Sequence, residues 1–146
     1  MGHSPATVDE KGRLKVPANF RKVIEDKYGS ECFITSTDGE RALIYPMPVW
    51  FDFQGRLSKV PSTSVAKAKL LERVNYYGQD VTLDGQGRVL IPQILRDAVK
   101  LPAEVVVTGN IDHLVVSDRG ALEGRLTTED FTDADYDELA KAWGQV

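Results

Sequence analysis

Residues 7–17 read TVDEKGRLKVP, and residues 82–92 read TLDGQGRVLIP. The two stretches align without a gap at an offset of 75 residues and share the pattern T-x-D-x-x-G-R-x-x-x-P. An arginine stands four residues beyond each proline, Arg21 in one copy and Arg96 in the other. A repeat of this kind predicts two copies of one supersecondary unit, so the sequence indicates a tandem duplication.

Each copy predicts a tight turn at its centre. The third turn position is glycine, Gly12 or Gly87, which suits a backbone of positive φ. An aspartate stands just before each turn, Asp9 or Asp84, where its side chain can accept backbone N–H bonds or pair with the arginine four residues on. We therefore expect two hairpin tips, each carrying a carboxylate at its base.

The residues after each turn alternate between apolar and polar, as in a strand with one buried face. In the first copy, Leu14 and Val16 are predicted to point inward. Arg13 and Lys15 are predicted to point outward. The matching positions of the second copy, in the same order, are Val89, Ile91, Arg88 and Leu90.

A helix is expected after each of these strands, with Pro17 and Pro92 in its first turn. Its inward face is marked by apolar residues at i, i+3, i+4 spacing, which are Phe20, Val23, Ile24, Leu95, Ala98 and Val99. A second apolar hairpin and a second helix follow in each copy. The first of these helices is expected near Pro48, with Trp50, Phe53 and Leu57 on one face, and the second near 117–118, with Leu122 and Leu126.

The copies divide the chain into a first repeat at residues 1–60, a linker helix within 61–78, a second repeat at 79–126 and an acidic tail at 127–146. The linker helix is expected from about Val65 to Tyr77, with Gly78 as its C-terminal stop. A repeat of about 70 residues buries little core alone. We therefore expect one α+β unit in which the copies share a core about a pseudo-twofold axis.

Composition and charge place the chain among soluble globular proteins, with 42% hydrophobic and 27% charged residues. No apolar run approaches the ~20 residues that cross a bilayer, and the start lacks the profile of a signal peptide, so a cytoplasmic location without membrane contact is expected. The net charge is −4, but residues 127–146 carry six acids against Lys141 alone, and the remainder is +1. The tail is expected to be a solvated helix, a disordered end, or a segment kept away from a polyanion.

The sequence lacks the motifs of catalysis and of metal binding. Residues 85–90 begin like a dinucleotide fingerprint but have Leu90 where the third glycine is required. The single Cys32 allows no disulfide within one chain. His3 is expected in a mobile start and His113 in a turn, which gives no metal pair. We therefore expect neither an enzyme nor a cofactor.

The outward cations indicate a nucleic-acid partner. Lys11, Arg13 and Lys15 are expected to form a cationic ridge on a two-stranded ribbon, a shape that the DNA major groove admits. Arg13 suits guanine O6 and N7, whereas Lys15, Arg21 and Lys22 suit phosphates. The alternative is a purely structural role, in which the aspartate and arginine of each turn only brace it.

The doubled D-x-x-G-R-x-x-x-P motif, together with LIYPMPVW at residues 43–50, resembles the MraZ family of bacterial transcriptional regulators. The resemblance spans roughly residues 8–116. It implies a fold similar to that of AbrB-like swapped-hairpin DNA-binding proteins, a pseudo-twofold β-barrel with flanking helices and both halves on one chain. It also implies a ring-shaped homo-oligomer of eight or twelve subunits that binds double-stranded DNA at short direct repeats upstream of a cell-division and cell-wall gene cluster. Such a protein is usually a repressor and is nucleoid-associated in the bacterial cytoplasm.

By position, the resemblance makes Asp9 with Arg13, and Asp84 with Arg88, the D-x-x-x-R pairs of the family. Lys11, Arg13 and Lys15 are then the implied DNA contacts. Together with Arg21, Lys22 and Arg88, which the residues themselves suggest, they make up the expected DNA-binding set. The implied structural positions are Asp9, Gly12, Pro17, Asp84, Gly87 and Pro92. Residues 1–7 lack the phenylalanine of the Phe-x-Gly strand that usually opens the family, so the resemblance does not itself imply a first strand or its contact in a ring. Two other hypotheses are a dimeric AbrB- or antitoxin-like DNA binder and a protein-interaction barrel, which the acidic net charge favours.

Overall fold

Eight strands and six helices follow one another within residues 1–143, the part of the chain that this computed structural model describes. The first repeat contains β1 (His3–Thr7), β2 (Arg13–Lys15), α1 (Ala18–Tyr28), β3 (Glu31–Thr35), β4 (Ala42–Pro46) and α2 (Met47–Ser58). The linker helix is α3 (Val65–Tyr77). The second repeat contains β5 (Gln79–Thr82), β6 (Arg88–Leu90), α4 (Gln93–Val99), β7 (Glu104–Asn110), β8 (His113–Ser117) and α5 (Arg119–Thr128), and α6 (Asp133–Ala142) follows it. The predicted α+β class is confirmed.

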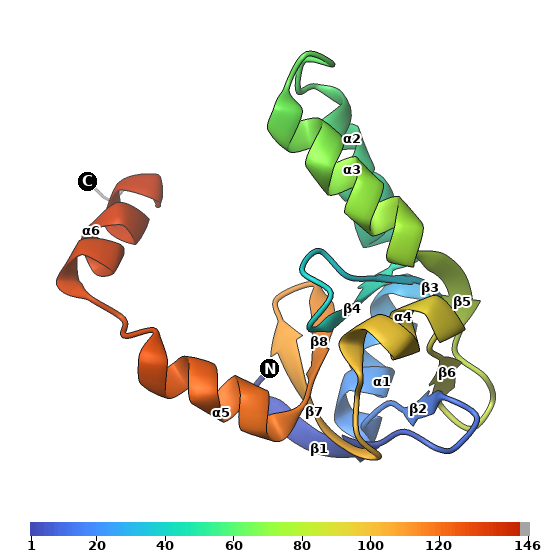
Figure 1. The fold of residues 1–146 in the computed structure, drawn as a ribbon. Coiled ribbons are helices and arrows are strands. Elements are labelled where there is room, and N and C mark those ends of the chain that lie inside the picture. Colours follow the sequence, from blue (N-terminus) through green and yellow to red (C-terminus); the bar gives the residue numbers. More distant parts are fainter. Residues whose placement is uncertain (144–146) are drawn as a thin grey trace.

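The main sheet has six strands in the order β1-β7-β8-β4-β3-β5, with every neighbouring pair antiparallel (Figure 1). The centre of the sheet lies between β4 and β8. Going outward, β3 and β5 on one side are the counterparts of β7 and β1 on the other. The edge strands are exchanged, because β1 of the first repeat pairs with β7 and β5 of the second repeat pairs with β3. The strand order is therefore related to itself by a pseudo-twofold axis between β4 and β8.

A separate two-stranded ribbon is formed by β2 and β6, one strand from each repeat. The facing pairs are Arg13 and Leu90, Leu14 and Val89, and Lys15 and Arg88. The predicted hairpin turns do form within each copy, as the bridge between Val8 and Leu14 shows for the first, but the two-stranded ribbon joins the two copies. Each of these strands is only three residues long, and pairing across the axis supplies the hydrogen bonds that such short strands need. A closed barrel, which the resemblance implied, does not occur among residues 1–143.

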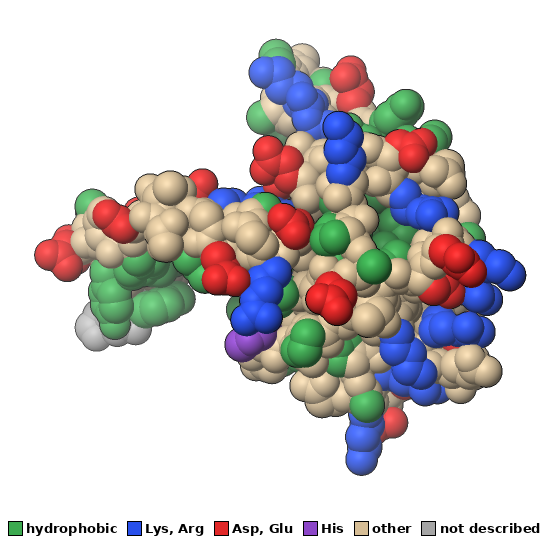
Figure 2. Space-filling view, turned by 60° about the horizontal axis from the view of Figure 1, so that its bottom comes forward, with side chains coloured by type: hydrophobic (Ala, Val, Ile, Leu, Met, Phe, Trp, Pro, Cys, Tyr) green, Lys and Arg blue, Asp and Glu red, His purple; other side chains and the backbone are tan. Residues whose placement is uncertain are grey.

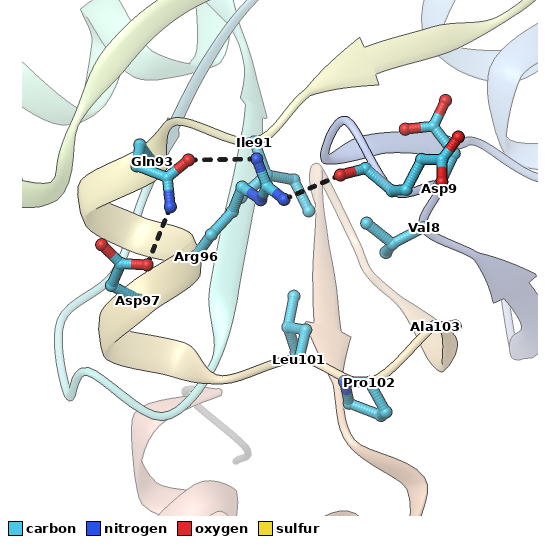
Figure 3. Close-up of a pocket in the computed structure, with 10 residues that line it drawn as sticks. Val8, Asp9, Ile91, Gln93, Arg96, Asp97, Leu101, Pro102 and Ala103 are labelled. Atoms are coloured by element: carbon cyan, nitrogen blue, oxygen red, sulfur yellow. Dashed lines mark hydrogen bonds between the residues drawn. The ribbon is translucent and has the colours of Figure 1, made fainter.

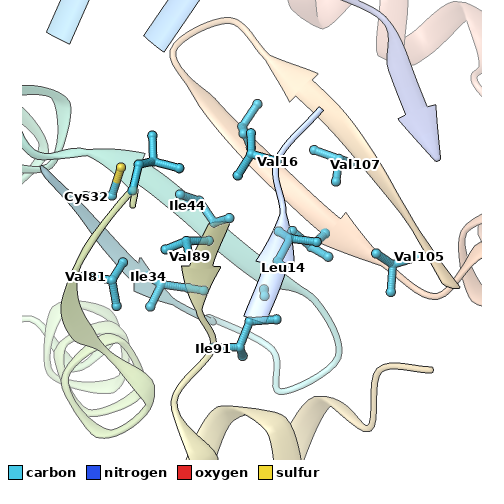
Figure 4. Close-up of a cluster of buried hydrophobic side chains, with 14 of the residues drawn as sticks. Leu14, Val16, Cys32, Ile34, Ile44, Val81, Val89, Ile91, Val105 and Val107 are labelled. Atoms are coloured by element: carbon cyan, nitrogen blue, oxygen red, sulfur yellow. The ribbon is translucent and has the colours of Figure 1, made fainter. Parts of the chain in front are cut away.

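The ribbon packs on the sheet and encloses one core that both repeats share (Figure 4). The predicted alternation is confirmed, since the inward side chains of the ribbon are at most 1% exposed: Leu14, Val16, Val89 and Ile91. The helices add Phe20, Ile24, Leu95 and Val99. Val23 was also expected on the inward face, but it is 49% exposed because α1 buries a narrower stripe of i, i+4 residues. Burying each large aliphatic side chain contributes about 1.5–3 kcal/mol.

The linker helix has the predicted bounds, and Gly78 follows it. A Cβ at Gly78 would lie 2.2 Å from the Val74 carbonyl oxygen and 2.3 Å from the Phe33 ring, so this position requires glycine. Phe33 also stacks on Trp50 of α2, with ring centroids 4.3 Å apart. In α2, Trp50 is buried while Phe53 and Leu57 are half-buried, as predicted. Helices α2 and α3 project from the sheet (Figure 1).

The C-terminal arm, defined here as α5 and α6, projects from the body in another direction (Figure 1). Helix α5 begins after Asp118, whose side chain caps it. Its predicted inward residue Leu122 is half-buried, but Leu126 is 69% exposed. Helix α6 confirms a solvated helix within the acidic tail, and the last residues of that tail, 144–146, lie outside the described part.

The start of the chain is ordered, contrary to expectation. His3 lies in β1, which pairs with Thr108 and its neighbours because β7 offers a seven-residue strand along which it can add. Within residues 1–143, no helix is both long enough and apolar enough to span a bilayer.

Candidate nucleic-acid interface

The first turn is closed by the side chain of Asp9. Its Oδ1 accepts backbone N–H bonds from Lys11 at 3.0 Å and Arg13 at 2.8 Å. Its Oδ2 accepts a bond from Arg13 Nε at 2.9 Å. The guanidinium is thereby fixed through Nε alone, and among residues 1–143 its two terminal nitrogens have no hydrogen bond to the protein.

The second turn repeats this geometry. Asp84 Oδ1 accepts from the backbone of Gln86 at 2.8 Å and of Arg88 at 2.9 Å, and its Oδ2 accepts from Arg88 Nε at 3.0 Å. The Arg13 and Arg88 side chains are 34% and 29% exposed. Both arginines are thus oriented and still accessible, so bracing a turn does not exclude contact with a ligand.

Both carboxylates are held in the ionised form. The pKa of Asp9 lies below its ordinary value, chiefly because the Arg13 N–H binds the carboxylate, with the Arg13 guanidinium and the Lys11 N–H adding to the effect. The pKa of Asp84 is lowered in the same way by the N–H of Arg88. Each brace is therefore a charge-assisted pair at neutral pH.

A third turn, which the sequence analysis missed, has the same local chemistry. Asp38 Oδ1 accepts from the backbone of Glu40 and Arg41 at 2.8 and 3.0 Å, and Oδ2 accepts from Arg41 Nε at 2.9 Å. This turn joins β3 and β4 and lies outside the ribbon. The Asp–Arg brace is thus a general turn device in this chain, and what distinguishes Arg13 and Arg88 is their place on the ribbon.

The turn glycines lie directly under arginines from the other repeat. Gly12 has φ +85° and Gly87 has φ +76°. A Cβ at Gly12 would lie 2.5 Å from Arg96 Nε, and a Cβ at Gly87 would lie 2.7 Å from Arg21 Cδ. Glycine is therefore favoured at both positions by its backbone conformation, and a Cβ there would also displace the arginine side chain that lies above it.

These two arginines form a reciprocal latch, a term used here for Arg21 and Arg96 on the opposite turns. Arg96 Nη1 donates to the Lys11 carbonyl oxygen at 3.2 Å. Its Nη2 donates to the Glu10 carbonyl oxygen at 3.3 Å, and Figure 3 shows how Arg96 reaches from α4 toward the first turn. Arg21 Nη2 donates to the Gly85 carbonyl oxygen at 3.1 Å. Sequence reasoning assigned Arg21 only to phosphates, although the matching place of the two arginines was a signal of a shared structural role.

The outward face of the ribbon collects cations from both repeats. Lys15 lies opposite Arg88 in the register and donates from Nζ to the Gln86 carbonyl oxygen. Arg13 lies on the same strand as Lys15, and the fourth outward position is Leu90. Two predicted contacts remain, Lys11 at the first turn and Lys22 on α1, and both are exposed. Figure 2 shows Lys and Arg side chains gathered on the side of the body away from the C-terminal arm.

Other side chains of the described residues bear on metal binding and on nucleophilic chemistry. Residues 1–143 hold no group of three or more side chains suited to a metal ion. His113 lies at the start of β8, beyond the predicted turn, and its ring bonds to Asp112. Cys32 is buried, and burial raises the pKa of its thiol to about 11. A pocket of about 360 Å³ lies beside Arg96 and is lined by the first turn, by α4 and by the segment that follows α4 (Figure 3).

The chain has a duplicated unit, exchanged edge strands and two turns that an aspartate and an arginine brace. These features define a class of proteins in which the D-x-x-x-R turn occurs twice in one chain. The chain belongs to the MraZ family, whose profile, described as MraZ protein, putative antitoxin-like, matches residues 1–73 and 78–135. It is 46% identical over 140 residues to the transcriptional regulator MraZ of Acidobacterium capsulatum, with 96% of each chain covered. It is 44% identical to that of Koribacter versatilis over 140 residues, or 95% of each chain. The resemblance inferred from the sequence is confirmed.

Proposed function

We propose that this protein regulates transcription by binding specific DNA sequences. The names of its relatives support the regulator role, and the DNA-binding part of the proposal rests on the ribbon. The observation that carries the proposal is the outward face of the β2–β6 ribbon, where Arg13, Lys15 and Arg88 lie together between two braced turns. A two-stranded ribbon fits the DNA major groove, and cations on its outer face meet base edges and phosphates.

Arg13 is the proposed base-reading residue. Asp9 holds its Nε and leaves the terminal nitrogens for guanine O6 and N7, a contact that discriminates against the wrong base by about 1–3 kcal/mol. Arg88 occupies the equivalent place in the second repeat. Lys11, Lys15 and Lys22 are proposed phosphate contacts. Arg21 joins them through Nη1, since its Nε pairs with Glu25 at 2.6 Å and its Nη2 holds the second turn.

The finer parts of the proposal concern assembly and target. One ribbon covers only a few base pairs, so a homo-oligomer on short direct repeats gains affinity through effective concentration. We propose a ring of eight or twelve subunits that represses a cell-division and cell-wall gene cluster by occluding its promoter, in the bacterial cytoplasm and at the nucleoid. The exchange of β1 and β5 between repeats supports placement in the swapped-hairpin class of AbrB-like proteins.

The test is genome-wide capture of bound DNA, followed by titration of the recovered site at several salt concentrations. A plot of log affinity against log salt is expected to fall with a slope of about −0.9 per neutralised phosphate. Recovery of no enriched site, or an affinity that does not change with salt, would refute DNA binding and favour the protein-interaction hypothesis. Light scattering separates a ring from an AbrB-like dimer.

A further inference from the structure

The C-terminal arm exposes an apolar stripe that nothing in its own chain covers among the described residues. Within α5 and α6 no residue is buried. Along α6 the residues Tyr136, Leu139 and Trp143 follow the i, i+3, i+7 spacing of one helix face. They are 58%, 39% and 61% exposed. Apolar side chains at this density on a projecting helix mark a surface that binds another protein.

Helix α6 is built to hold this stripe in place. Thr132 and Asp135 form a capping box at its start. Phe131 precedes the cap and packs edge-on against Tyr136, with ring centroids 6.2 Å apart, as a hydrophobic staple does. These local contacts stabilise the helix and fix where it begins. Its exposed apolar face therefore belongs to a regular helix and not to a frayed chain end.

The charge of α6 narrows the choice of partner surface. Helix α6 itself carries four carboxylates and one lysine, and with Glu129 and Asp130 just before it the net charge of residues 129–143 is −5. Two α6 helices meeting face to face would bring these charges together and repel each other. The receiving surface must therefore be basic and partly apolar, and must differ from α6 itself.

The helical hairpin of α2 and α3 has this chemistry. Residues 47–77 carry five cations and two carboxylates, a net charge of +3. On α3, Val65, Lys69, Arg73 and Tyr76 follow i, i+4, i+8, i+11 spacing and form one exposed stripe. Val65 and Tyr76 are 68% and 65% exposed. Two cations thus lie between two apolar side chains, which complements the acidic and aromatic α6.

We propose that α6 of one copy docks along the exposed stripe of α3 on a second copy of this chain. The two projections leave one body in different directions (Figure 1), so each copy offers an arm to one neighbour and a hairpin to another. Such a head-to-tail contact continues from copy to copy and closes when the rotation returns to the first. This inference deepens the homo-oligomer part of the proposed function and does not depend on DNA binding.

The experiment measures sedimentation of the full chain without DNA. An arm variant, Tyr136→Ala with Trp143→Ala, and a hairpin variant, Lys69→Glu with Arg73→Glu, are each expected to weaken self-association by about tenfold or more. Mixing the two variants allows one intact contact, in which the arm of the hairpin variant docks on the hairpin of the arm variant. The mixture is therefore expected to form 1:1 heterodimers and nothing larger.

The controls are exposed positions on α1, Val23→Ala and Lys27→Glu, which are expected to leave assembly unchanged. A charge exchange guards against misfolding: Asp137→Lys with Glu138→Lys disrupts assembly, and adding Lys69→Glu with Arg73→Glu to the same chain restores it. Assembly of either first variant at the wild-type level, or a mixture that stays monomeric, overturns the proposal. So does a wild-type chain that is itself monomeric.

Discussion

Arg96 of the second repeat lies over Gly12 of the first, with its guanidinium bonded to the Lys11 carbonyl oxygen at 3.2 Å. Arg21 lies over Gly87 in the reciprocal arrangement. Each braced turn of the ribbon is therefore contacted and positioned by a helix of the other repeat. The following predictions test this coupling and the surface that it supports.

Gly12→Ala is expected to destabilise the protein, because φ at this position is +85° and the new Cβ would meet Arg96 at 2.5 Å. A strained backbone conformation of this kind costs about 1–3 kcal/mol. The measurement is urea unfolding at one fixed protein concentration. The matched control is Gly55→Ala in α2, where a Cβ meets nothing within 4 Å and alanine stabilises a helix by about 0.5–1 kcal/mol. A Gly12→Ala chain as stable as wild type would contradict the positive φ at this position and the close approach of Arg96.

Combining Gly12→Ala with Arg96→Ala is expected to cost less than the two separate losses together. Removing the Arg96 side chain relieves the clash and leaves only the backbone strain at Gly12. Residues in contact show interaction energies of about 0.5–3 kcal/mol in such cycles. Strictly additive free energies of unfolding would show that Arg96 does not lie on Gly12 in solution.

Acid is expected to destabilise the braced turns. The folded-state pKa of Asp9 and of Asp84 lies below the ordinary value of 3.8. The stabilisation from these carboxylates is therefore fully present above about pH 4 and is lost as the pH falls through their folded pKa values. Unfolding measured from pH 7 downward should show this decline, and Asp9→Asn should flatten it. An equally steep decline in Asp9→Asn with Asp84→Asn would assign the acid sensitivity to other groups.

Cys32 is expected to react with a disulfide reagent only when the protein opens. The side chain is fully buried, and burial raises the pKa of its thiol to about 11, so the reactive thiolate is scarce at neutral pH. Labelling in native buffer should be far slower than in urea and should accelerate in Gly12→Ala. Fast labelling of the native protein would contradict this packing.

The sequence predicted those features of the fold that depend on neighbouring residues. The inward positions Leu14 and Val16 follow from alternation within one strand, and the end of α3 follows from Gly78 beside it. The partner of each strand could not be predicted in this way, because β2 pairs with β6 across 75 residues of chain. The ribbon is therefore shared between repeats, where a local pattern suggested one within each copy.

In the candidate site too, contacts between neighbouring residues were predictable from the sequence, and contacts between the repeats were not. Spacing alone predicted that Asp9 could pair with Arg13, since the two residues lie across one turn. It did not predict that Lys15 faces Arg88, or that Arg21 and Arg96 hold the opposite turns, because these contacts depend on the exchange of strands. Val23 was misplaced for a related reason, since helical spacing does not say how wide a stripe the core covers.

The central claim is that both repeats contribute to one DNA-binding ribbon, and the most direct test compares three arginines on the recovered DNA site. Arg13→Ala and Arg88→Ala are each expected to lose about 1–3 kcal/mol of specific binding, with circular dichroism unchanged. Arg41→Ala removes an arginine with the same kind of aspartate brace, outside the ribbon, and should bind as wild type does. Equal affinities for all three variants and the wild-type chain would contradict the account.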